Sequence, residues 1–195
     1  LEEMVANWGE DGEARGNLMG TDPQLGLVAI LTGLGSLSYG EVAGERMKLG
    51  LLLHDPEEEH DCFSDNTYNS HYYDQQGIAN VYLGRYKRVD GRIVEGPSLS
   101  DLVKEKDAAL DEEMRAKLNA TTEAMQAMRS RAEAGEAYAQ MIGEGNAEGN
   151  AVVQAAIDGL IDQTRTLERI VVKLDLQGVA IEGSDSLDKP DAVFE

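Results

Sequence analysis

Residues 148–174 read EGNAVVQAAIDGLIDQTRTLERIVVKL, and this stretch decides the fold class. Its apolar residues recur every three or four positions, which is the period of one face of an α-helix. The stripe consists of Val153, Ile157, Leu160, Ile161, Thr164, Leu167, Val171 and Leu174. A helix with one such face needs partner helices to cover it, so the stretch predicts a helical bundle.

A second stripe with the same period lies earlier in the chain, over residues 108–132. It consists of Leu110, Met114, Leu118, Met125 and Met128. Because methionine fills irregular gaps in protein cores, we interpret these residues as core packing rather than as a metal or cofactor site.

Two Asp-Pro pairs predict where the other long helices begin and end. Asp22-Pro23 supplies an N-cap and a first-turn proline for a helix over residues 23–54. Asp55-Pro56 ends that helix, because the residue before a proline disfavours helical backbone. A second helix should then begin near Pro56 and run to about Tyr82.

The pair Asp90-Gly91 lies between short alternating segments, which is a strong signal of a β-hairpin. We therefore expect an all-α fold, an up-and-down four-helix bundle with a small β-hairpin insertion. The bundle should span residues 23–176. The end of an earlier helix and a linker should precede it at residues 1–22, and an irregular acidic tail should follow at residues 177–195.

Composition limits the classes of function. The 195 residues carry 37 acids against 17 bases, a formal net charge of −20, so nucleic acid is not an expected partner. Cys62 is the only cysteine, which excludes a disulfide framework and any Cys-x-x-Cys metal motif. No uninterrupted run of about 18 apolar residues is present, so we expect no membrane-spanning segment.

The helix over residues 23–54 carries polar groups on an apolar stripe. Ser38, Glu41 and Glu45 share one helical face, and Arg46 follows directly. Buried carboxylates are costly unless they are paired, so both acids should have low exposure and a base nearby. Two interpretations stay open, a buried Glu–Arg network and a ligand or metal site. Gly26, Gly33, Gly40 and Gly44 recur along the same helix and predict close approach of another helix.

The segment after Pro56 is unusually polar for a bundle helix. A helical wheel places His60, Ser64, Thr67, His71 and Asp74 on one face, beside a stripe of Asp61, Asp65, Tyr68 and Tyr72. This face indicates either a polar cavity or a solvated helix start. His60 and His71 lie about 16 Å apart along a straight helix, so they cannot bind one ion unless the helix breaks.

Several strings resemble the imelysin family, which includes insulin-cleaving membrane proteases and iron-regulated proteins. They are GLGSLSYGEVAGERMKLGLLL (33–53), DPEEEHDCFSDNTYNSHYYD (55–74), GIANVYLGRY (77–86), EGNAVVQAAIDGLIDQT (148–164) and EGSDSLD (182–188). The iron-regulated branch is the closer match, and this chain resembles the C-terminal half of the family.

The resemblance implies a duplicated fold of two helical bundles with the functional site at their junction. It also implies a bacterial envelope protein, periplasmic or on the cell surface, that takes part in iron uptake and meets the membrane only through a lipid anchor outside this chain. Peptidase activity is assigned to some members. The family's Gly-x-His-x-x-Glu motif belongs to the N-terminal half, which is the expected partner, and is absent from this sequence.

These considerations give two functional hypotheses. The first is binding of iron, or of an iron-bearing ligand, and the second is a metallopeptidase with zinc as the alternative metal. The expected metal ligands are Glu41, Glu45, His60 and Asp61. The expected ligand-binding residues are Ser38, Arg46, Ser64, Asp65 and His71. No metalloprotease motif occurs in the chain, which favours the binding hypothesis.

Overall fold

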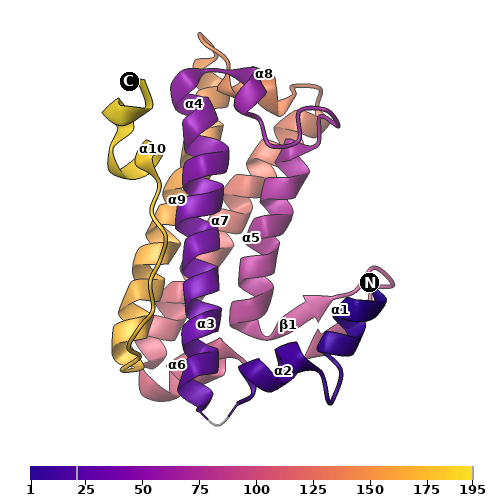
Figure 1. Cartoon of the computed structure of the whole chain (residues 1–195). Coiled ribbons are helices and arrows are strands. Elements are labelled where there is room, and N and C mark those ends of the chain that lie inside the picture. Colours follow the sequence, from indigo (N-terminus) through magenta and orange to yellow (C-terminus); the bar gives the residue numbers. More distant parts are fainter. Residues whose placement is uncertain (21, 195) are drawn as a thin grey trace.

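Four long helices run antiparallel through the molecule. The structure is a computed structural model that describes residues 1–20 and 22–194. The helices are, in chain order, the continuous rod α3 (Pro23–Ser36), η1 (Leu37–Lys48) and α4 (Leu49–Leu53), then α5 (Thr67–Leu83), α7 (Ala108–Glu133) and α9 (Ala147–Lys173). They alternate up and down in Figure 1, which confirms the all-α fold and the four-helix arrangement.

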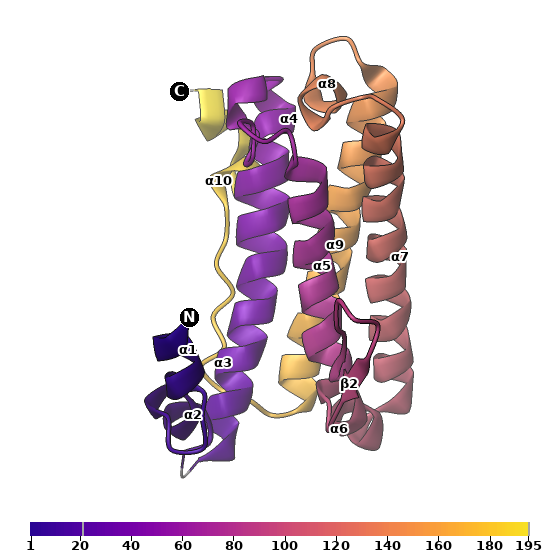
Figure 2. The same cartoon turned by 90° about the vertical axis from the view of Figure 1, so that its right-hand side faces the viewer.

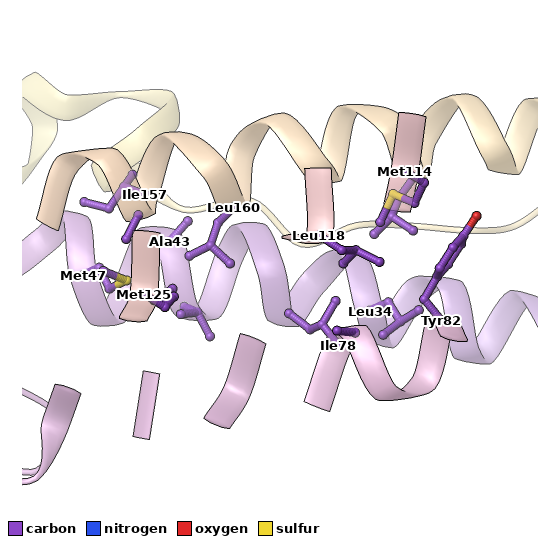
Figure 3. Close-up of a cluster of buried hydrophobic side chains, with 14 of the residues drawn as sticks. Leu34, Ala43, Met47, Ile78, Tyr82, Met114, Leu118, Met125, Ile157 and Leu160 are labelled. Atoms are coloured by element: carbon purple, nitrogen blue, oxygen red, sulfur yellow. The ribbon is translucent and has the colours of Figure 1, made fainter. Parts of the chain in front are cut away.

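The four helices close into a ring around one core. α7 packs between α5 and α9, and η1 completes the ring against α9 and α5. Figure 3 shows side chains from all four helices meeting in this core: Leu34, Ala43, Met47, Ile78, Tyr82, Met114, Leu118, Met125, Ile157 and Leu160. Each large apolar side chain buried there stabilises the fold by roughly 1.5–3 kcal/mol relative to an exposed one.

Short elements cap the two ends of the bundle. At the lower end in Figure 1 lie α1 (Glu2–Asn7), α2 (Glu13–Leu18), the strands β1 (Arg85–Lys87) and β2 (Ile93–Glu95), and α6 (Leu99–Lys106). The strands pair antiparallel around Asp90-Gly91, which confirms the hairpin. α6 begins with a capping box between Ser98 and Asp101. Figure 2 shows α8 (Tyr138–Ile142) at the opposite end.

The helix expected to begin near Pro56 begins at Thr67 instead. His54 ends α4 in the left-handed region, with φ of 53°, and η2 (Pro56–Glu58) makes only a single tight turn. Asp65 also has a positive φ, of 49°. Residues 59–66, called here the polar loop, are therefore irregular. The prediction was wrong because acids in a first turn favour a helix but do not enforce one.

The C-terminal residues 177–194, called here the strap, run back along the outside of η1 toward the α4 end (Figures 1 and 2). The strap includes α10 (Asp185–Asp188) and η3 (Pro190–Phe194). Ser186 Oγ donates to the Gly44 carbonyl at 2.9 Å, and the Glu182 N–H donates to Ser36 Oγ at 3.0 Å. The tail, expected to be irregular, is thus a docked segment with two short helical turns.

Glycines on η1 make this docking possible. A Cβ at Gly40 would lie 2.8 Å from the Glu182 carbonyl oxygen, and one at Gly44 would overlap the Ser184 side chain. Close approach at these two glycines was expected from another helix, but the strap takes that place. At Gly33 a Cβ would meet nothing within 4 Å, so close approach was a wrong expectation there.

The rod Pro23–Leu53 is long and apolar enough, by length and composition alone, to cross a membrane. Its most apolar 18-residue window has a mean hydropathy of 1.4. The evidence for a membrane span remains weak, because the core helix of a bundle meets the same standard and this rod packs against α9 and α5.

Candidate functional site

A cluster of charged side chains joins η1 to α5, and its location is called here the groove. The Arg46 guanidinium donates to Asp74 Oδ2 at 3.0 Å and to Glu41 Oε2 at 3.3 Å. η1 is a π-helix, whose backbone hydrogen bonds join residues five positions apart. Residues i and i+5 therefore lie on the same side of the helix, about one turn from each other. This winding brings Glu41 under Arg46. Burial raises the pKa of Asp74, and the nearby Arg46 charge opposes that rise.

The polar loop adds Asp61 to the same groove. Its N–H donates to Thr67 Oγ1 at 3.0 Å, and its carboxylate accepts a hydrogen bond from the Ser70 hydroxyl. Both partners belong to the first turn of α5, so they fix the loop onto the start of that helix. The charges of Asp61 and His60 also act on the pKa of Asp74, after the larger effects of burial and of Arg46.

His60 and His71 lie close together because the expected helix is broken. Their ring centroids are 6.5 Å apart, against about 16 Å for eleven residues of straight helix. His71 is fully buried, and neither ring nitrogen has a hydrogen-bond partner among the described residues. Burial, reinforced by the charges of His60 and Arg46, lowers the pKa of His71 to about 3, so the ring is neutral at physiological pH.

Two further buried groups lie behind His71. The Tyr138 ring, from α8, meets the His71 ring edge to face at a centroid distance of 5.3 Å. Its hydroxyl has no hydrogen-bond partner among the described residues, and neither does Glu59 Oε2 of the polar loop. Burial is the largest cause that raises the pKa of both side chains, and the Glu59 charge adds to the rise at Tyr138.

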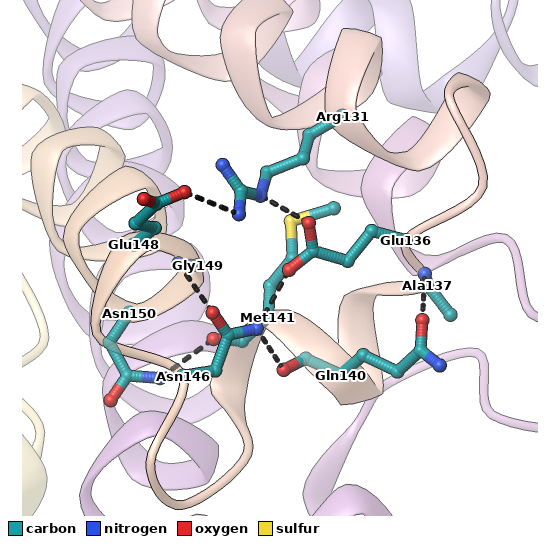
Figure 4. A network of polar contacts seen from close by, with 9 residues as sticks. All are labelled: Arg131, Glu136, Ala137, Gln140, Met141, Asn146, Glu148, Gly149 and Asn150. Atoms are coloured by element: carbon teal, nitrogen blue, oxygen red, sulfur yellow. Dashed lines mark hydrogen bonds and ion pairs between the residues drawn. The ribbon is translucent and has the colours of Figure 1, made fainter.

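A polar network shown in Figure 4 holds α8 in place. Asn146 caps α9 by accepting from the Gly149 N–H at 3.0 Å, and its amide donates to Glu136 at 2.7 Å. Arg131 pairs with Glu136 and Glu148. Because every group in this network has a partner, we assign it to structure: it fixes the turns around α8 and therefore the position of Tyr138.

Among the expected site residues, Ser38 and Glu45 lie away from the cluster, and Ser64 and Asp65 lie on the polar loop beside it. Ser38 is buried and donates to the Leu160 carbonyl at 3.0 Å. Glu45 is exposed, contrary to expectation, and accepts from Ser184 Oγ at 2.6 Å. Ser64 and Asp65 are exposed residues of the polar loop. The π-winding of η1 and the broken helix explain these outcomes, since the expected faces assumed regular α-helices.

Ser38 instead belongs to a buried amide network in the centre of the bundle. The Gln163 amide donates to Ser38 Oγ at 2.9 Å and to Gln75 Oε1 at 2.8 Å, and Gln75 returns a bond to Gln163 at 3.0 Å. These buried polar groups are paired with one another, which makes the network structural. The sequence shows both glutamines within helical segments but does not indicate that they meet.

The cluster therefore gathers Glu41, Arg46, His60, Asp61 and His71 from the expected set. It adds Asp74, which lay on the predicted face, and Glu59 and Tyr138, which sequence reasoning did not assign to the site. Histidine, cysteine and carboxylate side chains alone form no group of three or more suited to a metal ion within residues 1–20 and 22–194. Two surface hollows lie elsewhere, one beneath the strap and one beside the hairpin.

Comparison with known proteins identifies the family of this chain. No curated protein matches the chain. The family model described as Imelysin, a peptidase family, matches residues 1–167, a range that contains every residue of the cluster. The match extends over far more than half of the 195 residues, and the chain belongs to the imelysin family.

Proposed function

We propose that this chain binds iron, as an ion or within a small ligand, at the groove between η1 and α5. One observation carries the proposal: the Glu41 and Asp74 carboxylates share the single guanidinium of Arg46, and the charge of a third carboxylate, that of Asp61, acts on Asp74. Three negative charges against one positive charge leave an excess of negative charge in a half-buried place. A cation relieves that excess more effectively than solvent does at partly buried positions.

The donor chemistry supports iron over softer metals. Carboxylate oxygens with imidazole nitrogens suit hard and borderline cations, whereas soft cations prefer thiolates. His60 is exposed and lies beside the groove, where its ring is accessible to an incoming ion. Cys62 is exposed on the polar loop. Zinc is the alternative metal, because imidazole and carboxylate bind it as well.

We further propose that a second helical bundle, carrying Gly-x-His-x-x-Glu, completes the coordination shell. The groove supplies charge but lacks a complete ligand set of its own among the described residues. Binding by this chain should therefore be weaker than binding by a protein that holds both halves. The proposed setting is the bacterial envelope, where capture of iron precedes its transport.

Calorimetric titration with Fe(III) supplied as its nitrilotriacetate complex tests the proposal. Glu41→Gln and Asp61→Asn each remove one charge and keep an oxygen acceptor, so binding should weaken at least several-fold in each. Glu45→Gln is the matched control, because Glu45 lies one turn from Glu41 but contacts the strap. Equal affinity in all four proteins, or no heat of binding in any, would show that the cluster is an ion-pair network only.

The family match favours one second candidate, a metallopeptidase. Such an enzyme needs a metal-bound water and a general base, and Glu59 is a buried carboxylate beside the groove whose pKa is raised. Incubation of an unfolded protein substrate with the zinc-loaded chain, with Glu59→Gln as the comparison, tests this function. Cleavage that persists unchanged in Glu59→Gln would exclude Glu59 as the base.

A further inference from the structure

The helices α3 and α5 carry almost no charge, although the chain as a whole has a formal net charge of −20. α3 contains no charged residue, and α5 contains only Asp74, which is paired with Arg46. The helices α7 and α9 differ, because charged side chains such as Glu112 and Glu168 lie along their exposed faces. The exposed face of a bundle helix is normally charged or polar, so the uncharged pair of helices indicates a surface for a partner.

Two arms project from the bundle on either side of α3 and α5. The first arm, residues 1–20, contains α1 and α2, and the second arm is the hairpin, residues 85–95. Figure 1 shows both arms on the same side of the lower end of the bundle. Figure 2 looks at that side and shows α3 and α5 between the arms. The outward sides of these two helices between the arms are called here the uncharged face.

The side of α3 that belongs to this face is fixed by its contact with the first arm. A Cβ at Gly26 would lie 2.8 Å from the carbonyl oxygen of Leu18, the last residue of α2. Ala29 and Gly33 follow three and seven positions later, so they share the side of Gly26. Both residues are exposed, which leaves this side of α3 open and free of charge.

α5 contributes to the same face through residues beside the hairpin. A hollow of about 480 Å³ lies there, lined on α5 by Gln76, Gly77 and Asn80 and on the hairpin by Arg85, Tyr86 and Lys87. A Cβ at Gly77 would meet nothing within 4 Å, and Val81 is 49% exposed. This side of α5 is therefore open as well.

Most of the large apolar side chains that the described residues expose lie on the arms, α3 and α5. The first arm exposes Met4, Val5, Trp8 and Met19, and the hairpin exposes Tyr86, Val89, Ile93 and Val94. Phe63, Val172 and Phe194 lie outside these four elements. Exposed apolar side chains that gather on one side of a protein mark an interaction surface.

The two arms carry opposite charge. Residues 1–20 contain five acids and one base, whereas residues 85–95 contain four bases and two acids. Arg85 pairs with Glu95, and Arg92 pairs with Asp90. Lys87 and Arg88, and likewise the acids of the first arm, take part in no ion pair within residues 1–20 and 22–194. Each arm therefore has charge available for a partner of the opposite sign.

We propose that the uncharged face binds a second copy of this chain, in a two-fold symmetric dimer whose axis runs parallel to the long helices. When two copies face each other about such an axis, the left side of one lies opposite the right side of the other. The acidic first arm of each copy then meets the basic hairpin of the other, and the two uncharged faces meet between them.

Charge complementarity favours a second copy over other occupants. An acidic partner would match the hairpin alone, and a basic partner would match the first arm alone, whereas a second copy matches both arms at once. The inference is separate from iron binding, because the arms and the polar loop lie at opposite ends of the bundle in Figure 1. Metal-free protein is therefore suitable for the test.

Sedimentation velocity of the metal-free chain over a concentration series tests the inference. Wild-type protein should form a dimer. The combined changes Lys87→Glu and Arg88→Glu reverse the hairpin charge, and the combined changes Glu10→Lys and Asp11→Lys reverse the charge of the first arm. Either double variant should self-associate about ten-fold or more weakly, because like charges then meet at both contacts. An equimolar mixture of the two double variants should recover the dimer, since opposite charges then meet again at both contacts.

A matched pair of variants tests the uncharged face itself. Val81→Glu places a carboxylate on the face and should weaken the dimer about ten-fold or more, because the charge must be desolvated without a partner. Val172→Glu is the control, since Val172 is 79% exposed on α9, outside the face, and its replacement should leave the dimer unchanged. Far-UV circular dichroism checks that every variant keeps its helices.

The outcomes that contradict the proposal are distinct. A monomer at every concentration would overturn it. A dimer that tolerates Val81→Glu and both charge reversals would also overturn it, because the copies would then associate through another surface. Failure of the mixture to recover the dimer would show that the arms do not meet as proposed. Iron binding at the groove is measured separately, so each of these results leaves that proposal unaffected.

Discussion

Neighbouring carboxylates on the two sides of η1 have different kinds of partner. On the groove side, Glu41 shares Arg46 with Asp74 and the acids outnumber the bases. On the strap side, Glu45 accepts a hydrogen bond from Ser184, and Tyr39 donates to Asp188 at 2.7 Å. A polar residue on η1 therefore takes its role from the segment that faces it: on one side the acids share a guanidinium, and on the other they accept hydrogen bonds from hydroxyl groups.

The largest effect should follow from blocking the strap. Gly44→Ala places a methyl group where Ser184 packs, so the strap must move and the free energy of unfolding should fall by about 1–3 kcal/mol. Gly33→Ala, on the same rod where a Cβ meets nothing, should instead stabilise by up to about 1 kcal/mol. Urea unfolding of both variants measures the difference, and equal stabilities would show that the strap contributes nothing.

On the groove side, Arg46→Met should destabilise the fold by about 1–2 kcal/mol, because it leaves the half-buried Asp74 without its cation. Adding Asp74→Asn should recover part of that loss, since the unpaired charge is then removed. A double-mutant cycle by chemical unfolding gives the coupling. Strictly additive losses would indicate that the pair stabilises nothing.

Glu41→Gln and Glu45→Gln should both have little effect on the stability of the fold, although only Glu41→Gln is expected to weaken iron binding. Glu45→Gln should lower the free energy of unfolding by less than about 1 kcal/mol, since Ser184 can donate to the amide oxygen instead. Glu41→Gln should be similarly mild, because its ion pair is partly exposed. Differential scanning calorimetry of metal-free protein compares them, and a large loss in either would mean that its contact supports the fold more than its exposure indicates.

The smallest expected effect is a loss of stability at alkaline pH, caused by ionisation of Tyr39 on the strap side. Burial, together with the Asp188 carboxylate, raises the pKa of Tyr39 from 10.0 to about 12. Below pH 10 the tyrosine is protonated in both states, and between pH 10 and 12 the unfolded chain loses the proton first. Stability should therefore fall over that window by more in wild type than in Tyr39→Phe, as measured by urea midpoints at several pH values. Parallel pH profiles would show that the tyrosine titrates normally.

The long helices could be predicted from sequence because their apolar stripes repeat within each helix. Met114, Leu118, Met125 and Met128 are all buried, as the period of the stripe indicated. The hairpin could be predicted for the same reason, because the adjacent residues Asp90 and Gly91 determine its turn. These features depend on residues close together in the chain, and that is why one sequence suffices to find them.

The rest depends on contacts between distant segments. The contact of η1 with the strap joins Gly44 and Ser186, which are 142 positions apart. The break at the polar loop depends on Thr67 and Ser70 bonding back to Asp61. Glu59 was within an acidic run and Tyr138 within a short helical piece, so neither carried a signal that they would be buried together.

The strap also imposes an order on folding during synthesis. Ser184 follows Glu45 by 139 residues, so a ribosome making about 5–20 residues per second completes the long rod on the order of ten seconds before the strap exists. Until then Gly40 and Gly44 leave an open channel along the nascent bundle.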